Sequence, residues 1–116
     1  MIEIYHNSRC KKSRAGLRAL ESITPDFKII EYLKEDAFTI ESLTAVLIKL
    51  SKHPDEIIRK QEAIYKSNFK GRNFNETEWV KILVENPKLI QRPIVVKDEK
   101  AILGDPVEQI ALLFTM

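Results

Sequence analysis

Residues 2–20 read IEIYHNSRCKKSRAGLRAL and pass from a strand pattern through a polar turn into a helix pattern. Ile2–Tyr5 forms a short strand-like run, and the turn that follows is residues 6–9. Residues 11–22 then place apolar side chains at approximately helical spacing. The one cysteine of the chain, Cys10, lies where the turn meets the predicted helix. The segment therefore predicts a thiol at the N-terminus of a helix that follows a strand.

The segments further along the chain complete a mixed α/β pattern. Phe27–Leu33 predicts a second strand, which should run parallel to the first because a helix joins them. Residues 93–96 and 101–103 predict two more strands, joined by a turn into an antiparallel hairpin. A last helix follows, with Asp105 expected as its N-cap and Pro106 as its first residue. The order β-α-β and then β-β-α predicts a thioredoxin-like mixed β-sheet.

The middle of the chain has helical signals only. Thr39 is a plausible N-cap for a helix that runs to about Ser51, and a short helix should begin at His53-Pro54. Residues 75–78 have the spacing of a capping box, which predicts another helix after them. We therefore expect a single thioredoxin-like domain over residues 1–116, with a helical insertion over about residues 34–91.

Composition bounds the class of protein. Of the 116 residues, 44% are hydrophobic and 31% are charged, which is typical of a globular protein. The net charge of +2 gives no reason to expect direct binding of nucleic acid. No signal peptide or apolar segment of membrane-spanning length is visible. We expect a cytoplasmic monomer with no membrane contact.

A single cysteine excludes an internal disulfide and a cysteine-cluster metal site within one chain. The histidines, His6 and His53, and Cys10 have no recognisable ligand spacing, so no metal is expected. No bound cofactor is expected either.

The surroundings of Cys10 predict a reactive thiol. Unpaired N–H groups and the positive end of the helix dipole lower a thiol pKa at such a position. Residues 9–18 contain five basic side chains and no acidic one. His6 could bring a further donor near the sulfur, and Ser13 could hydrogen-bond a thiolate. The alternatives are a buried inert cysteine, a surface histidine at a strand end, and a serine that bonds only to backbone.

Two arginines are candidates by position. Arg92 precedes Pro93 at the start of a predicted strand, and the bond between them is a candidate cis peptide. There the arginine could face the helix that carries Cys10. Arg59 follows a short helix, where a solvated cation that compensates the helix dipole is the ordinary alternative.

The stretch His6-Asn7-Ser8-Arg9-Cys10-Lys11-Lys12-Ser13-Arg14 resembles the signature H-N-x-x-C-x-x-S-R of the glutaredoxin-dependent arsenate reductase family. The stretch 91–96, QRPIVV, resembles the second signature of that family, R-P-I-V, and the stretch 57–60, IIRK, resembles the segment that supplies another arginine. The resemblance covers essentially the whole chain. The same family includes transcriptional regulators that bind RNA polymerase.

The resemblance implies a one-cysteine mechanism. Cys10 would attack arsenate, and His6 and Ser13 would lower its pKa. Glutathione, as external reductant, would reduce the arsenic, and glutaredoxin would recycle the mixed disulfide. The resemblance also implies an oxyanion site for arsenate or a similar substrate, formed by Arg14, Arg59, Arg92 and Pro93.

One position departs from the family. The reductases typically carry a third arginine before a proline in the loop that leads to the last helix, whereas this chain has Asp105 before Pro106. A carboxylate facing the Cys10 pocket would weaken arsenate binding, unless Arg9, Lys11 or Lys12 compensates for the charge.

Three functions therefore stay open. The first is an arsenate reductase. The second is a related glutathione-dependent thiol oxidoreductase without arsenate activity. The third is an RNA-polymerase-binding regulator, which the serine at position 13 disfavours because regulators of that branch commonly carry a CxxC pair.

Overall fold

The computed structural model describes residues 1–34 and 37–115, which fold as two units. We call Met1–Ala37 with Arg92–Met116 the sheet unit, and Phe38–Gln91 the helical unit. The sheet unit contains β1 (Ile2–His6), α1 (Lys11–Glu21), β2 (Lys28–Glu31), β3 (Ile94–Lys97), β4 (Lys100–Leu103) and α5 (Glu108–Leu112). The helical unit contains α2 (Ile40–Leu50), the 3₁₀ helix η1 (Pro54–Ile57), α3 (Ala63–Asn68), α4 (Glu76–Glu85) and the 3₁₀ helix η2 (Pro87–Leu89).

The four strands form one mixed sheet in the order β2-β1-β3-β4. The parallel pairing of β1 with β2 and the antiparallel β3–β4 hairpin are both as expected from the sequence. β3 also pairs with β1 in antiparallel fashion, with Val95 opposite Ile4. This mixed sheet, with β-α-β followed by β-β-α, confirms the predicted thioredoxin-like α/β class.

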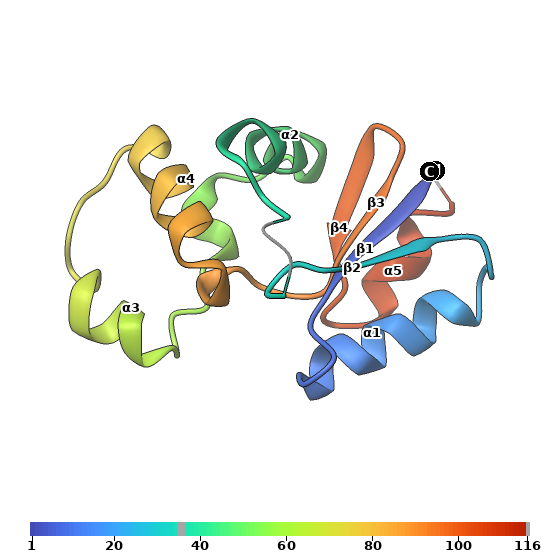
Figure 1. The fold of residues 1–116 in the computed structure, drawn as a ribbon. Helices are drawn as coiled ribbons and strands as arrows, with labels where there is room; N and C mark the ends of the chain where they lie inside the picture. The colour runs from blue at the N-terminus through green and yellow to red at the C-terminus, as the bar shows by residue number, and fades with distance from the viewer. Residues whose placement is uncertain (35–36, 116) are drawn as a thin grey trace. The chain divides into compact units, whose positions relative to one another are not determined.

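Helices α1 and α5 cover one face of this sheet (Figure 1). They do so because their apolar side chains meet those of the central strands in one cluster. Its fully or almost fully buried members are Ile4, Leu20, Val95, Ile110 and Leu113. Helix α1 is thereby fixed on the sheet, and its first residue follows directly on Cys10.

The helical unit is held together by capped helices around an apolar interior. Thr39 and Ser42 form a capping box at the start of α2, and Asn75 and Glu78 form the predicted one at the start of α4. Helix α2 packs against α4, and α4 packs against both 3₁₀ helices. An antiparallel bridge between Ile58 and Ile90 joins the two ends of the segment that contains α3 and α4. No helix in the part of the chain that the structure describes is long and apolar enough to cross a membrane.

The structure corrects the sequence-based elements at three places. His6 belongs to β1, opposite Glu31, rather than to the turn. The helix α3 lay in a segment for which no element was predicted. The last helix begins at Glu108, and Asp105 is not its N-cap. The backbone N–H of Gln109, in α5, donates to the Pro106 carbonyl. The Asp105 carboxylate instead forms an ion pair with Lys12.

The predicted cis bond between Arg92 and Pro93 is present. The Asp105–Pro106 bond, for which no isomer was predicted, is also cis.

Candidate active site at the start of helix α1

Cys10 lies in the sheet unit as the N-cap residue of α1 and is partly buried. Its backbone N–H donates to the Asn7 carbonyl at 3.0 Å, and its carbonyl accepts from the Arg14 N–H at 2.9 Å. These bonds close the loop between β1 and α1 at the first turn of the helix. The sulfur is therefore held among N–H groups that have no partner within the helix.

Charges and dipoles at this position favour the thiolate. Burial raises the pKa of the Cys10 thiol, but the backbone N–H of Ser13, the Arg92 guanidinium and the backbone N–H of Lys12 lower it by more. The net result is a pKa below the ordinary value for cysteine. The lowered pKa increases the fraction of Cys10 that is thiolate at a given pH, and the thiolate is the form of cysteine that can act as a nucleophile.

Arg92 is the charged group that contacts Cys10. Its side chain is buried, with 9% of the residue exposed, and it hydrogen-bonds with both Cys10 and Tyr32. Burial lowers the pKa of the guanidinium, yet Tyr32 and Cys10 raise it by more, so Arg92 stays fully charged. A buried, charged guanidinium beside a thiolate is also suited to bind an oxyanion that reacts there.

Tyr32 was not identified as a site residue in the sequence, although a signal for it existed. It follows directly on β2, and Cys10 follows closely on β1. Because β1 and β2 are parallel, residues beyond their C-terminal ends lie at the same edge of the sheet. Tyr32 is only 2% exposed, so its hydroxyl needs a buried partner, which Arg92 provides.

His6 and Ser13 form a buried pair beside the cysteine loop. The His6 Nδ1 and Ser13 Oγ atoms lie 2.6 Å apart, and Ser13 Oγ also accepts the backbone N–H of Asn7 at 3.0 Å. Burial is the main cause that lowers the His6 pKa, so the imidazole is neutral at neutral pH. The Ser13 hydroxyl can then donate to Nδ1 while it accepts from Asn7. Within this arrangement it is the backbone N–H of Ser13 that acts on Cys10.

Pro93 packs between two glycines that belong to different elements. A Cβ atom added at Gly16, on α1, would lie 2.4 Å from Pro93 Cγ, and one added at Gly104 would lie 2.7 Å from the same atom. The Gly104 N–H also donates to the Pro93 carbonyl at 2.8 Å. The residue next to Arg92 is therefore held directly against α1, the helix whose N-cap is Cys10.

Arg14, a predicted substrate-binding residue, lies exposed in the first turn of α1. One of its guanidinium nitrogens, Nη1, donates to the Ser8 carbonyl at 3.0 Å. The structure thus brings together six of the seven predicted residues in the sheet unit: Cys10, His6, Ser13, Arg14, Arg92 and Pro93.

The seventh predicted residue, Arg59, belongs to the helical unit. Its Nε and Nη2 atoms each lie 3.2 Å from Oε2 of Glu62, and its backbone N–H donates to the Leu89 carbonyl at 2.7 Å. Its role at an oxyanion site stays a prediction.

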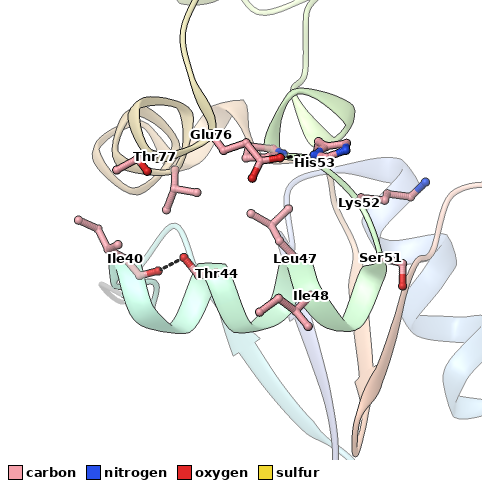
Figure 2. Close-up of a pocket in the computed structure, with 11 residues that line it drawn as sticks. Ile40, Thr44, Leu47, Ile48, Ser51, Lys52, His53, Glu76 and Thr77 are labelled. Carbon is pink, nitrogen blue, oxygen red and sulfur yellow. Dashed lines mark hydrogen bonds and ion pairs between the residues drawn. The ribbon is translucent and has the colours of Figure 1, made fainter.

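The helical unit contains a pocket of about 390 Å³ that none of the predicted site residues lines. Figure 2 shows Leu47 of α2 pointing toward Glu76 and Thr77 across this pocket, with His53 paired to Glu76 at one end. Most of the lining is apolar, and its histidine and carboxylate are already paired with each other. The reactive groups described above therefore place the candidate active site at Cys10.

Known proteins resemble this chain in both sequence and fold. The model of the ArsC family matches residues 5–113. The chain is 38% identical over 112 residues to the uncharacterized protein YfgD of Escherichia coli, covering 94% of this chain and 92% of the relative. It is 34% identical over 113 residues to an arsenate reductase of Haemophilus influenzae, covering 94% and 95%. The solved arsenate reductase of Vibrio cholerae superposes with a TM-score of 0.84 at 33% identity, covering 92% of each chain.

Proposed function

Because the chain belongs to the ArsC family, we propose that it is a one-cysteine oxidoreductase that reduces arsenate to arsenite, with Cys10 as the nucleophile. The observation that carries this proposal is the hydrogen bond between Cys10 and the buried guanidinium of Arg92 at the start of α1. The same contact lowers the thiol pKa and supplies a cation for the substrate. The arsenate reductases among the relatives make arsenate the first substrate to test.

In the first step the Cys10 thiolate attacks the arsenic of arsenate. A sulfur–arsenic bond forms, one arsenate oxygen leaves as water after it takes up protons, and arsenic stays in oxidation state +5. The Arg92 guanidinium, and N–H groups of the first turn of α1, bind the remaining oxygens. Arg14, Pro93 and Arg59 are the other residues proposed for the oxyanion site. The His6–Ser13 pair acts through the cysteine loop, because it holds Asn7 and the first turn of α1 in place.

In the second step the thiolate of glutathione attacks the sulfur of Cys10. The electron pair of the sulfur–arsenic bond passes to arsenic, which is reduced from +5 to +3 and leaves as arsenite. Cys10 is left in a mixed disulfide with glutathione, so one thiol from each partner has supplied the two electrons. A glutaredoxin thiol then attacks the glutathione sulfur and releases Cys10 as a thiolate.

The need for an external thiol follows from the sequence. The chain has no second cysteine that could form an internal disulfide with Cys10. The reductant must therefore come from outside, and we propose glutathione with glutaredoxin as partner. A reducing compartment such as the cytoplasm supplies both.

A second candidate function is favoured by one contact. Asp105 pairs with Lys12 in the first turn of α1, with Lys12 Nζ and Asp105 Oδ2 3.4 Å apart. The pair removes a free cation near the thiol, which weakens the site for a doubly charged oxyanion. A glutathione-dependent thiol oxidoreductase that acts on a less charged substrate would keep Cys10 and Arg92 and tolerate this pair.

The test is arsenate turnover, coupled to NADPH oxidation through glutathione, glutaredoxin and glutathione reductase. We expect turnover by the wild-type chain and none above background for Cys10→Ser, which keeps the size of the side chain but loses the thiolate. Ser67→Ala is a matched control because Ser67 is exposed in α3, in the other unit. It should leave turnover unchanged.

Mass spectrometry of the wild-type chain separates the two candidate functions. If arsenate is not reduced but glutathione disulfide still modifies Cys10, the second candidate replaces the first. If neither reaction occurs, Cys10 is not a redox-active nucleophile and both candidates are wrong.

A further inference from the structure

The ion pair between Lys12 and Asp105 joins two elements of the sheet unit at the start of α1. Lys12 is the second residue of α1, and Asp105 lies in the loop between β4 and α5. The separation of 3.4 Å is that of a direct ion pair. No other residue among those described lies within ion-pair distance of either side chain.

This pair lies beside the reactive thiol. The backbone N–H of Lys12 is one of the groups that stabilise the Cys10 thiolate. On the other side, Gly104 precedes Asp105 and hydrogen-bonds to Pro93, which follows Arg92. Both partners are therefore attached to backbone segments that touch the site.

The charges around Cys10 are otherwise positive. Arg92 contacts the sulfur, Arg14 lies in the same turn of α1, and Arg9 and Lys11 flank the cysteine in sequence. Glu31, the acidic residue that acts on His6, hydrogen-bonds with the Ser8 side chain and pairs with Lys34, whose Nζ lies 3.2 Å away. Among the described residues, Asp105 is thus the carboxylate that forms an ion pair with a cation of the first turn of α1.

We propose that Asp105 is a specificity-determining residue of the Cys10 site, because its pairing with Lys12 lowers the preference of this otherwise positive site for negatively charged substrates over neutral ones. The inference rests on the proposed function of Cys10 as a nucleophile, and it names the charge class of the substrate. The reaction rate of a neutral reagent does not depend on the ion pair. A negatively charged reagent would be attracted by an unpaired Lys12, and the pairing with Asp105 removes that attraction.

The size of the effect follows from the exposure of the pair. The side chains of Lys12 and Asp105 are 64% and 43% exposed, so solvent screens their charges. A unit charge that acts through an environment close to water changes a rate or affinity by about twofold to fivefold. The effect should fade as salt is raised, because the Debye length falls to about 3 Å at 1 M.

The test compares two reagents that alkylate Cys10. Iodoacetate carries one negative charge, iodoacetamide carries none, and both react with the same thiolate. The ratio of their rate constants measures the electrostatic potential at the sulfur and is independent of the fraction ionised. For Asp105→Asn we expect the iodoacetate to iodoacetamide ratio to rise about twofold to fivefold at low salt. For Lys12→Met we expect it to fall by a similar factor.

Asp98→Asn provides a matched control. Like Asp105, Asp98 is an exposed carboxylate in an ion pair, with its Oδ1 atom 3.1 Å from the terminal amino group of Met1. Both substitutions replace aspartate with asparagine. It lies in the β3–β4 turn, at the end of the sheet where β1 begins, whereas Cys10 follows the end of β1. The ratio of the iodoacetate to the iodoacetamide rate constant for Asp98→Asn should equal that of the wild type.

The double variant Lys12→Met/Asp105→Asn decides whether the two residues act as a pair. A ratio close to wild type supports the inference, since both charges of a mutually neutralised pair have been removed. The inference is overturned if Asp105→Asn gives the same ratio as Asp98→Asn, or if Lys12→Met leaves the ratio unchanged. Slow alkylation of every variant by both reagents would instead contradict the proposed function, because Cys10 would then lack thiolate character.

Discussion

The sheet unit and the helical unit use their polar side chains in opposite ways. In the sheet unit, His6, Ser13 and Arg92 are buried and bonded to one another or to the groups around Cys10. In the helical unit, residues 38–91, every buried residue is apolar, aromatic or proline. Its buried positions carry no charge: His53 and Glu76 pair at the surface, and Arg59 and Glu62 form a half-buried pair.

This difference shows which charges can affect chemistry. A buried charge acts on its neighbours with little screening, whereas an exposed pair is screened by water and salt. Arg92 is therefore expected to change the behaviour of the thiol, while the exposed ion pair of His53 with Glu76 should affect little beyond its own contact. The following experiments test that contrast.

The largest effect is expected for Arg92→Ala. Arg92 lowers the pKa of the Cys10 thiol, so its loss should raise that pKa and shift the pH profile of alkylation by iodoacetamide to higher pH. Turnover of arsenate should fall by about 100-fold, the loss typical when one preorganised donor is removed. Arg92→Lys should restore part of the pH profile but less of the turnover, because lysine keeps the charge without the planar fork.

Arg72→Ala is the matched control in the helical unit. The Arg72 guanidinium lies 5.1 Å from the centre of the Phe74 ring, and Arg72 is remote in sequence from the cysteine loop. Neither the alkylation profile nor turnover should change. An Arg92→Ala profile equal to that of Arg72→Ala would contradict the assignment of Arg92.

The next effect concerns packing next to the site. Helix propensity alone predicts that Gly16→Ala stabilises the fold by about 1 kcal/mol. The contact with Pro93 instead predicts that Gly16→Ala destabilises the fold, because the new Cβ would lie 2.4 Å from Cγ of the proline ring. We expect the free energy of unfolding, measured by chemical denaturation, to fall by about 1–3 kcal/mol.

Gly71→Ala is its counterpart in the helical unit. Gly71 has a φ of +78° and nothing within 4 Å of an added Cβ, so alanine there should cost about 1 kcal/mol through the backbone alone. Adding Pro93→Ala should recover stability in the Gly16→Ala background but not in the Gly71→Ala background. A stabilising Gly16→Ala would show that the close approach is relieved without cost.

The smallest effect is expected from the surface pair of His53 and Glu76. Glu76 is the main cause that raises the His53 pKa, so the pair stabilises the fold when the imidazole is protonated. This contribution is fully present below the ordinary histidine pKa of about 6.5 and is lost as pH rises through the raised value. The stability difference between wild type and Glu76→Gln should therefore be larger at about pH 5.5 than at about pH 8.5.

The alkylation of Cys10 should be the same in Glu76→Gln and wild type at both pH values. A stability difference that does not depend on pH would mean that Glu76 acts only as an acidic residue in the first turn of α4.

The sequence allowed most of the fold to be predicted where local signals were strong. The N-cap of α2 and the capping box of α4 were readable because hydroxyl, amide and carboxylate side chains stand at fixed positions around the first helical residue. Helix α3 was missed because none of its residues is buried, and so it has no apolar periodicity to detect. The start of α5 was placed too early because Asp105-Pro106 also has the local pattern of a helix N-terminus.

In the candidate site too, residues with a local sequence signal could be predicted, whereas contacts made by the tertiary structure could not. Cys10 was identifiable from its position and the local charge, and the ArsC family match confirms the family resemblance. The contact of Arg92 with Tyr32 was not readable, because it joins residues 60 positions apart through the tertiary structure. The partner of Asp105 was equally hidden, since several cations near Cys10 were within reach of a carboxylate and only the fold selects Lys12.

The placement of the Pro93 ring between Gly16 and Gly104 has a consequence for how the sequence can evolve. Neither glycine can acquire a side chain while proline stands at position 93 without moving α1 or the loop after β4. A change at either position must therefore follow, rather than precede, a smaller residue at position 93. That smaller residue would be the immediate neighbour of Arg92, so a change at either glycine would also alter the segment that positions the guanidinium beside Cys10.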